Sequence, residues 1–279
     1  IYTNNDDGWE TAKDLKKAGC NVVCIIDQRS NIKPPVENID HILGGNIVKA
    51  KGNLRISSIT LDNGRVINTD CLAVSGGYNP NLHLTCHQRG KPKWNEVNHC
   101  FVPHNPPKTM EVIGAANGLF NHEEMFNDSK IKLTKILKNI GFKKIAVEKV
   151  NISKKVYQVS PFPKKIPEGK IWVDLQNDVT VKDIKLAVHE GFHSVELLKR
   201  YTTLGMATDQ GKNSNVLGLS VLSLIKNKPM NEVGTTIFRP PFTPVPIGAF
   251  AGRSRGKHFK PFRLTPSHNW AKSNNAVFV

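Results

Sequence analysis

The chain has 279 residues, a length that is enough for one large or two small domains with a core, and 39% of the residues are hydrophobic. Its formal net charge is +16, and twelve lysines against two glutamates between residues 130 and 170 supply +10 of it. This excess is lysine rather than arginine, and neither aromatic clusters nor a nucleic-acid fold motif accompany it. We interpret it as a solvated face, or one that docks an acidic partner, and expect no nucleic-acid partner. With no run of eighteen apolar residues and no signal-peptide pattern, we expect a cytoplasmic protein without a membrane partner.

The five cysteines show no Cys-x-x-Cys spacing, and an odd number in a chain of this size is typical of reduced thiols. Cys86, His87, His99 and Cys100 have side chains that can bind zinc, but their spacing matches no standard zinc site. The sequence therefore predicts no metal site, with zinc at these four residues as the minor alternative.

The first 27 residues follow a strand–turn–helix–strand pattern that ends at Asp27. Tyr2 and Thr3 end a strand, residues 4–8 form a tight turn, residues 9–18 form a helix and residues 21–26 form a buried strand. A glycine-rich turn followed about twenty residues later by an acid is the fingerprint of a dinucleotide site, where the acid accepts a ribose hydroxyl. Here asparagines replace the first glycines, and their side chains fill space that a pyrophosphate needs. Two hypotheses stay open: this half binds a nucleotide, or it keeps the fold without the ligand.

Two strand signals follow. Residues 51–67 alternate in polarity around the hairpin signal Asp62-Asn63-Gly64. Residues 70–81, Asp-Cys-Leu-Ala-Val-Ser-Gly-Gly-Tyr-Asn-Pro-Asn, predict a buried strand that ends in a small residue, glycine and a later Pro-Asn. This order closely resembles the return segment of two-dinucleotide-binding flavoproteins. An ordinary strand and turn is the alternative.

Residues 111–118, Glu-Val-Ile-Gly-Ala-Ala-Asn-Gly, complete that pattern. A short strand is expected to deliver Gly114, and a helix starting near Leu119 then points its amide groups toward an anion. In two-dinucleotide folds this motif lines the cofactor of the first nucleotide domain. Flavin-binding relatives usually carry an acid where Ala115 stands here.

Residues 171–236 predict a helical module with a polar turn inside it. The signals for the starts and the stop of its helices are Thr180 with Asp183 as a capping box, Gly191, Ser194 and Ser214. The turn Gly205–Lys212, Gly-Met-Ala-Thr-Asp-Gln-Gly-Lys, lies between the second and third helices. A generic three-helix unit explains the periodicity of the helices but not the glycine-bracketed polar turn.

This segment resembles the helical module in the α subunit of heterotetrameric sarcosine oxidases. It is also similar to the iron–sulfur module of dye-linked proline, opine and cyanide-forming amino-acid dehydrogenases, where Cys-x-Cys and Cys-x4-Cys hold a [2Fe–2S] cluster. The matching positions here are Asp174, Gln176, Asp209 and Ser214. None of them is a thiolate, so a cluster cannot be held in the family's way. This departure favours the sarcosine oxidase branch.

The final segment is rich in proline and extended, which is typical of a connector laid across a surface. The strings YTTLGMATDQGK, GTTIFRPPFTPV and TPSHNW together carry the resemblance, which covers nearly all of the chain. In sarcosine oxidase α subunits the same string leads into a folate-binding domain like an aminomethyltransferase. We expect both ends to be cut from a longer polypeptide, with the first nucleotide strand and the folate-binding domain outside the chain.

The predicted fold class is α/β: a partial Rossmann-type domain like that of two-dinucleotide-binding flavoproteins, then a small all-α module and an extended proline-rich connector. The predicted domains are residues 1–140, like the pyridine nucleotide-disulfide oxidoreductases, a lysine-rich linker at 141–170, the cysteine-less helical module at 171–236 and the connector at 237–279.

The resemblance implies part of an α subunit that works with β, γ and δ subunits on sarcosine. The whole enzyme would oxidatively demethylate sarcosine to glycine, pass the one-carbon unit to tetrahydrofolate and reduce oxygen to hydrogen peroxide. FAD and tetrahydrofolate would lie elsewhere in the complex, FMN at the interface with the β subunit and NAD in the α subunit. The present chain would supply scaffold, part of the NAD site and part of the FMN wall, with no catalytic residue and no activity alone.

The same resemblance implies the cofactor-binding residues. Ala115, Phe120 and His122 are the expected NAD contacts, with Gly114 and Gly118 letting the backbone come close. Core packing is the alternative for Phe120, and an exposed position on a helix is the alternative for His122.

Lys212 is expected near the FMN or its phosphate, as a cation that stabilises negative charge. The alternative is a solvated lysine in a turn whose glycines merely link helices. Two other functions also stay open for the chain as a whole: an α-type subunit of a related amine or amino-acid dehydrogenase, and a non-catalytic assembly subunit.

Overall fold

Four short parallel strands organise the first part of the computed structural model, which describes residues 1–142, 166–167, 169–241, 243–259 and 262–278. They are β1 (Tyr2–Thr3), β2 (Ile25–Asp27), β3 (His41–Leu43) and β7 (Val74–Ser75). Their order is β3-β2-β1-β7, so β1 lies inside the sheet. Helix α1 (Asp7–Lys17) connects β1 to β2, and this βαβ unit is the α/β arrangement expected from the sequence.

The two faces of the sheet are covered by different elements. Ile25 packs with Trp9 and Ala12 of α1, whereas Ile26 packs with Ile59 and other apolar residues of an antiparallel sheet. Alternate residues of a strand point to opposite faces, so Asp27 is expected on the same face as Ile25, toward α1. The polar end of β2 is thereby directed at the helix.

The antiparallel sheet consists of β4 (Ile47–Gly52), β5 (Ile56–Leu61) and β6 (Val66–Asn68) in that order. The hairpin predicted at residues 62–64 is confirmed, because β5 and β6 pair antiparallel across it. Gly64 adopts a φ of +83°, which a residue with a side chain rarely accepts.

Two expectations about the parallel strands were wrong. The strand predicted at residues 21–26 spans only Ile25–Asp27. β7 was expected to be buried, but Val74 is 57% exposed, because β7 lies at the edge of the described sheet.

A second antiparallel ribbon follows, formed by β8 (Lys91–Asn95) and β9 (Cys100–His104), with helix α2 (His83–His87) before it. The 3₁₀ helix η1 (Gly114–Asn117) and helix α3 (His122–Asn139) come next. Residues 111–113 lie outside any strand, so the strand expected before Gly114 is absent from this described segment. The helix begins at His122 rather than near Leu119, because the side chain of Asn121 accepts hydrogen bonds from the amides of Glu123 and Glu124.

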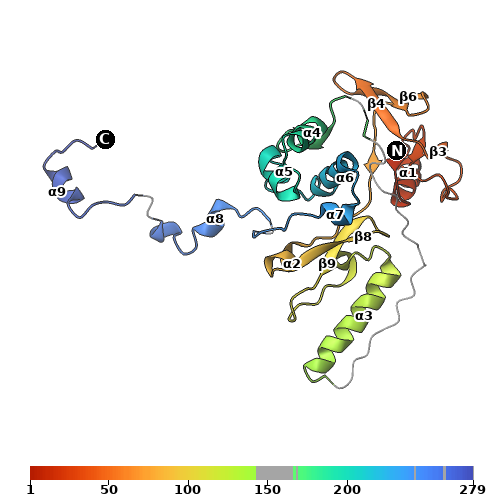
Figure 1. Ribbon diagram of the computed structural model, residues 1–279. Coiled ribbons are helices and arrows are strands. Elements are labelled where there is room, and N and C mark those ends of the chain that lie inside the picture. The colour runs from red at the N-terminus through yellow and green to blue at the C-terminus, as the bar shows by residue number, and fades with distance from the viewer. Residues whose placement is uncertain (143–165, 168, 242, 260–261, 279) are drawn as a thin grey trace. The chain divides into compact units, whose positions relative to one another are not determined.

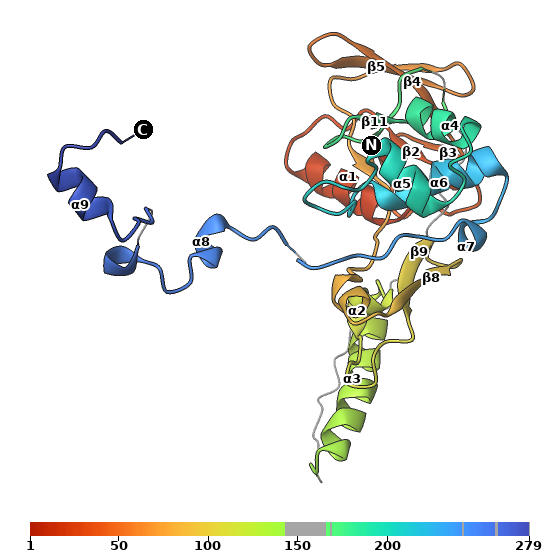
Figure 2. The ribbon, with the colours of Figure 1, turned by 60° about the vertical axis from the view of Figure 1, so that its left-hand side comes forward.

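The segment after residue 170 begins with a hairpin, β10 (Trp172–Asp174) and β11 (Val179–Thr180), that the sequence did not predict. Helices α4 (Val181–His189), α5 (Val195–Thr202), α6 (Asn215–Lys226) and α7 (Met230–Val233) follow. Thr180 and Asp183 form the expected capping box, and the Ser194 hydroxyl accepts from the Leu197 amide. Both ribbon views show α4, α5 and α6 side by side (Figures 1 and 2).

A single apolar core holds these helices to the hairpin. Its fully buried members include Val179, Ile184, Leu198 and Leu222, one from β11 and one from each of the three helices. A neighbouring cluster joins Leu219 of α6 to Trp94 and Phe101 of the β8–β9 ribbon and to Phe238. The ribbon and the helical segment are thus packed against one another.

The chain divides into two compact units, Ile1–Phe242 and Thr243–Val279. The second unit contains α8 (Ile247–Phe250), the 3₁₀ helix η2 (Gly256–His258) and α9 (His268–Ser273). None of its described residues is buried. Most of the lysine-rich linker predicted at 141–170 lies outside the described residues, and the domain boundaries stay predictions. Across the described ranges, every helix is too short or too polar to span a bilayer.

Candidate functional site

A cavity of about 460 Å³ joins three segments that are far apart in sequence. Its walls come from the turn before α1, the segment after β7 and the η1–α3 region. The lining residues are Asp6, Asp7, Tyr78, Asn79, Pro80, Asn81, Ala115, Ala116, Phe120, Asn121, His122 and Met125. The structure therefore brings together Ala115, Phe120 and His122, the three side chains predicted to contact a nucleotide.

The cavity has an aromatic wall and an acidic wall. The rings of Tyr78 and Phe120 lie 5.5 Å apart at 33°. Burial raises the pKa of Tyr78, and the negative charge of Asp7 and a hydrogen bond with it raise that pKa further. Asp6 and Asp7 bring carboxylates, and none of the twelve described lining residues is a lysine or arginine. Aromatic side chains favour a flat ring, and carboxylates accept hydrogen bonds from hydroxyl groups but repel a phosphate. A ligand with a flat ring and hydroxyl groups therefore fits this cavity better than a phosphate does.

The two glycines predicted beside this site have different surroundings. Gly118 has a φ of +79°, and a Cβ there would lie 2.5 Å from Val102 Cγ1, so protein packing alone requires glycine. Gly114 has a φ of +61°, and its Cβ would meet Met125 Sδ at 3.8 Å, an ordinary contact. A close approach of ligand to their backbone stays a prediction.

The turn Gly205–Lys212 is hydrogen-bonded to residues 239–241. Gln210 Nε2 donates to the carbonyls of Arg239 and Pro241, each at 2.7 Å, and its Oε1 accepts from the Arg239 amide at 3.0 Å. Asn215 Nδ2 donates to the Gln210 carbonyl at 3.0 Å and fixes the turn from inside. The polar turn therefore has a structural role, which is to hold residues 239–241, and the sequence did not predict this role.

Three of the four positions that match cluster cysteines in the iron–sulfur relatives engage in hydrogen bonds around Asp174. The carboxylate of Asp174, 2% exposed, accepts from the Gly205 amide at 2.8 Å, the Ser214 hydroxyl at 3.2 Å and the Gln176 amide at 3.0 Å. Ser214 stands at the start of α6 as expected, but its hydroxyl makes no cap and bonds Asp174 instead. Carboxylate, amide and hydroxyl oxygens suit an iron–sulfur cluster poorly, so these residues do not fit one.

Lys212 lies near His83 and is not among the residues that line the Ala115 cavity. His83 is 1% exposed and stacks on Phe238 with ring centroids 3.9 Å apart. Burial lowers the pKa of His83 to about 4, with repulsion from Lys212 and His87 adding to the effect. At neutral pH the imidazole is therefore uncharged, and Lys212 faces it as a cation.

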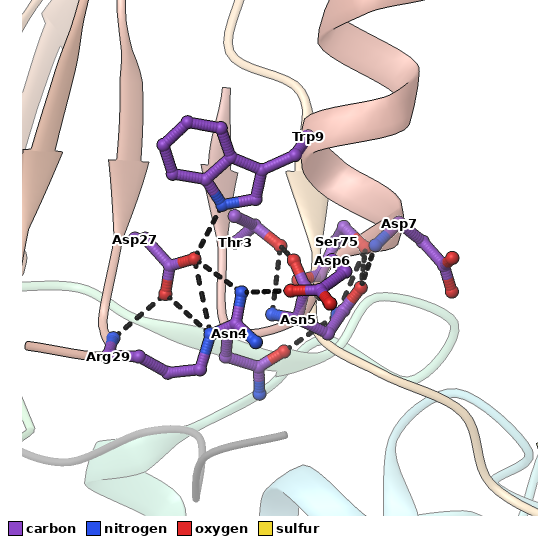
Figure 3. Close-up of polar contacts among 9 residues, drawn as sticks. All are labelled: Thr3, Asn4, Asn5, Asp6, Asp7, Trp9, Asp27, Arg29 and Ser75. Atoms are coloured by element: carbon purple, nitrogen blue, oxygen red, sulfur yellow. Dashed lines mark hydrogen bonds and ion pairs between the residues drawn. The ribbon is translucent and has the colours of Figure 1, made fainter. Parts of the chain in front are cut away.

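Asp27, the acid of the predicted fingerprint, is fully buried at the end of β2. Its carboxylate accepts from Trp9 Nε1 at 2.7 Å and from Arg29 Nη2 at 2.7 Å (Figure 3). Sequence reasoning missed both partners. The Asp-x-Arg spacing after the strand was the available signal, but it does not reveal that the two side chains fold back on each other.

The four residues of the zinc alternative do not form a metal site. Burial raises the pKa of Cys100 to about 12 and also raises that of Cys86, so both thiols favour the protonated form in the metal-free chain. Within the described ranges, no three His, Cys, Asp or Glu side chains are close enough to hold a metal ion.

The burial of His83 predicts a dependence of stability on pH. The unfolded chain protonates His83 near its ordinary pKa of about 6.5, whereas the folded chain resists protonation down to about 4. The stability contributed by neutral His83 is therefore complete above about pH 6.5 and is lost as the pH falls toward 4. His83→Phe keeps an aromatic ring against Phe238 and removes this loss.

Urea unfolding at about pH 7.5 and about pH 5 measures the effect. Lowering the pH should decrease the free energy of unfolding of the parent by about 2 kcal/mol more than that of His83→Phe. The exposed His104, changed to Phe, is the control and should leave the pH dependence of the parent unchanged. Equal pH dependence in the parent and His83→Phe would show that His83 protonates freely in the folded protein.

Comparison with known proteins supports the resemblance to sarcosine oxidase α subunits along the whole chain. Residues 168–253 match the family described as Sarcosine oxidase A3 domain. The chain is 40% identical over 292 aligned residues to sarcosine oxidase subunit alpha of Rhizobium meliloti (strain 1021), covering 100% of the chain and 29% of that protein. It is 33% identical to sarcosine oxidase subunit alpha of Corynebacterium sp. (strain U-96), covering 100% of the chain and 31% of that protein. It thus spans about three-tenths of these relatives.

The fold is similar to that of L-proline dehydrogenase from P. horikoshii, with a TM-score of 0.62 and 19% identity. This likeness covers 88% of the chain and 49% of the dehydrogenase chain, and it supports the α/β flavoprotein fold. Over its full length the chain is homologous to sarcosine oxidase α subunits, and residues 168–253 match the A3 domain of that family.

Proposed function

We propose that this chain is part of the α subunit of a heterotetrameric sarcosine oxidase, and that it supplies scaffold, part of an NAD site and part of the wall of an FMN site. The observation that carries the proposal is the 40% identity to a sarcosine oxidase subunit alpha, which extends over the full chain. Identity at this level over both the sheet and the helical segment is consistent with a shared subunit role rather than with one borrowed domain.

The Ala115 cavity is the proposed NAD contact region. Phe120 and Tyr78 offer ring faces, and His122 and the asparagines of the lining offer hydrogen bonds to hydroxyl groups. Asp6 and Asp7 oppose a phosphate there. The residues therefore fit the ring-and-ribose end of the dinucleotide, and groups elsewhere in the parent protein would hold its pyrophosphate. In this proposal the bound NAD has a structural role and takes no part in the reaction.

Lys212 is the proposed contribution to the FMN wall. It is partly buried, and the neutral His83 beside it adds no second positive charge at physiological pH. Gln210 anchors the same turn to residues 239–241, so the position of the Lys212 side chain is restrained by its backbone. A restrained cation at an interface can stabilise negative charge on a flavin or its phosphate.

The chemistry of the proposed whole enzyme lies outside this chain. The β subunit would oxidise the amine on FAD, and a folate-binding domain would accept the one-carbon unit on tetrahydrofolate, with oxygen reduced to hydrogen peroxide. The γ and δ subunits complete the proposed assembly. The fold of L-proline dehydrogenase supports a second candidate, an α-type subunit of an amine or amino-acid dehydrogenase. Oxidation of sarcosine and of L-proline, each followed both by oxygen consumption and by reduction of an artificial electron-acceptor dye, distinguishes the two.

Replacing Phe120 with Ala tests the NAD contact. Loss of one ring face should weaken NAD binding about tenfold, which corresponds to about 1.4 kcal/mol. NAD released by denaturing the assembled enzyme after dialysis, counted per α polypeptide, measures the change. Phe126→Ala, on the exposed side of α3, is the matched control and should keep the parent content. An unchanged NAD content in Phe120→Ala would remove the cavity from the NAD site.

Lys212→Met tests the flavin contact in the assembled enzyme, because it removes the charge and keeps much of the length of the side chain. We expect loss of flavin content or at least a tenfold slower reduction of oxygen, an effect of about 1.4 kcal/mol. Lys212→Arg keeps the charge and should retain both properties. If Lys212→Met stays within about twofold of the parent in both, Lys212 has no part in a flavin site.

A further inference from the structure

The turn between β1 and α1 has the place in the fold where a Rossmann-type unit receives a dinucleotide. In such units the pyrophosphate lies on the turn at the helix N-terminus, and an acid at the end of the second strand binds the ribose. Here those two places are the turn at residues 4–6 and Asp27. Figure 3 shows both places filled by protein side chains that hydrogen-bond one another.

The hydrogen-bonding capacity of Asp27 is used within the protein. Oδ2 accepts from Trp9 Nε1 and from Arg29 Nη2, each at 2.7 Å, and Oδ1 accepts from the Arg29 amide at 2.8 Å and from Arg29 Nε at 3.1 Å. Asp27 is 0% exposed, Trp9 0% and Arg29 7%. A ribose hydroxyl at Asp27 would have to displace the indole and the guanidinium, both of which pack inside the protein.

Asn5 fills the place of the pyrophosphate. Its Oδ1 accepts from the Asp7 amide in the first turn of α1 at 3.0 Å, a bond that a phosphate oxygen would otherwise take. Its Nδ2 donates to the carbonyl and the hydroxyl of Ser75 on β7, each at 3.2 Å. Asn5 is fully buried, so the side chain bridges α1 and β7 in the space where glycine would leave room for a ligand.

The charges at the turn also oppose a dinucleotide. Asp6 and Asp7 stand at the helix start, and Asp6 pairs with Arg29 at 2.8 Å while Arg29 also pairs with Asp27. Burial works against the charge on Arg29, but hydrogen bonds and attraction to Asp27 and Asp6 outweigh it and raise the pKa of the guanidinium. The single cation is thus shared between two carboxylates, and Asp7 adds a third negative charge close to where the two charges of a pyrophosphate would lie.

We infer that this βαβ unit is a nucleotide-type fold closed from within: Asn5 takes the place of the pyrophosphate, Trp9 and Arg29 take the place of the ribose at Asp27, and no dinucleotide binds here. The Asp27–Arg29 pair is then a structural element, one that stabilises the unit in the way a bound ligand stabilises its open relatives. The inference concerns the space at Asn5 and Asp27. The NAD site proposed at Ala115 shares Asp6 and Asp7 with the turn, but its ring contacts come from other residues, among them Phe120 and Tyr78.

Nucleotide titration of the full polypeptide is the first test. The amounts of NAD⁺, NADH, NADP⁺ and NADPH bound at up to about 1 mM are compared between the parent and Asp27→Asn, a range that covers weak binding. We expect identical nucleotide content in the two proteins. An additional equivalent in the parent, weakened tenfold or more in Asp27→Asn, would overturn the inference. Loss of NAD through Phe120→Ala would change both proteins equally, so the two hypotheses fail separately.

Thermal unfolding supplies the second test, because a closed site predicts that its members stabilise the fold without ligand. Arg29→Met leaves the Asp27 carboxylate buried without its cation and should lower the unfolding temperature of this unit by about 5 °C or more. The double variant Asp27→Asn/Arg29→Met should lose less than the sum of the single variants, because the two groups interact directly. Arg65→Met changes an exposed arginine and is the control. It should shift the unfolding temperature by less than about 1 °C.

Trp9→Phe serves as the milder variant if Arg29→Met does not fold. It removes only the indole donor to Asp27 and keeps an aromatic ring in the core, and we expect a decrease of about 2 to 4 °C. Unfolding temperatures of Trp9→Phe and Arg29→Met within about 1 °C of the parent would contradict a structural role for the group.

Discussion

The buried carboxylate of Asp174 is the contact on which the helical segment depends. A carboxylate that is 2% exposed is costly unless hydrogen-bond donors surround it, and here the donors come from the backbone of Gly205, the backbone of Gln176 and the hydroxyl of Ser214. They lie on the polar turn, on the hairpin loop and at the start of α6. One charged group therefore fixes three segments, and through the turn it also fixes Gln210, which holds residues 239–241.

Asp27 performs a similar task in the first half of the chain. Both acids stand at the end of a short strand, both are buried and both have donors from elements beyond their own strand. In the related folds that bind a dinucleotide or an iron–sulfur cluster, corresponding positions serve a group from outside the chain. In this chain, side chains and backbone amides satisfy them. Under the proposed function, the nucleotide contacts the Ala115 cavity instead.

Local sequence signals predicted the elements that local contacts decide. The Thr180–Asp183 capping box and the hairpin at residues 62–64 are confirmed because their partners are close in sequence, three residues apart in the capping box and ten or fewer in the hairpin. Ser214 was predicted as a helix cap, and its hydroxyl instead bonds Asp174, forty residues away. No local rule weighs a cap against a distant buried acid, so this error is one that only tertiary structure corrects.

The candidate sites divide in the same way. Of the residues predicted to contact a nucleotide, Ala115, Phe120 and His122 line one cavity, and their role as contacts stays a prediction. The other lining residues, among them Asp6, Asp7 and Tyr78, were not predicted, since they come from two other segments that the sheet topology brings to this cavity. Whether Asp27 binds a nucleotide could not be decided from the sequence for the same reason. Its partner Arg29 is close in sequence, but Trp9 contacts it only because α1 packs against β2.

A comparison of Asp174→Ala with Gln176→Ala tests most directly whether a buried carboxylate, rather than a bound group, holds the helical segment together. Both residues match cluster positions in the related iron–sulfur modules, but Gln176 is exposed. Urea unfolding should show a loss of stability on the order of 3 kcal/mol for Asp174→Ala, because three donors lose a charged acceptor. Gln176→Ala should stay within about 0.5 kcal/mol of the parent. Equal stabilities of the two variants would contradict the account.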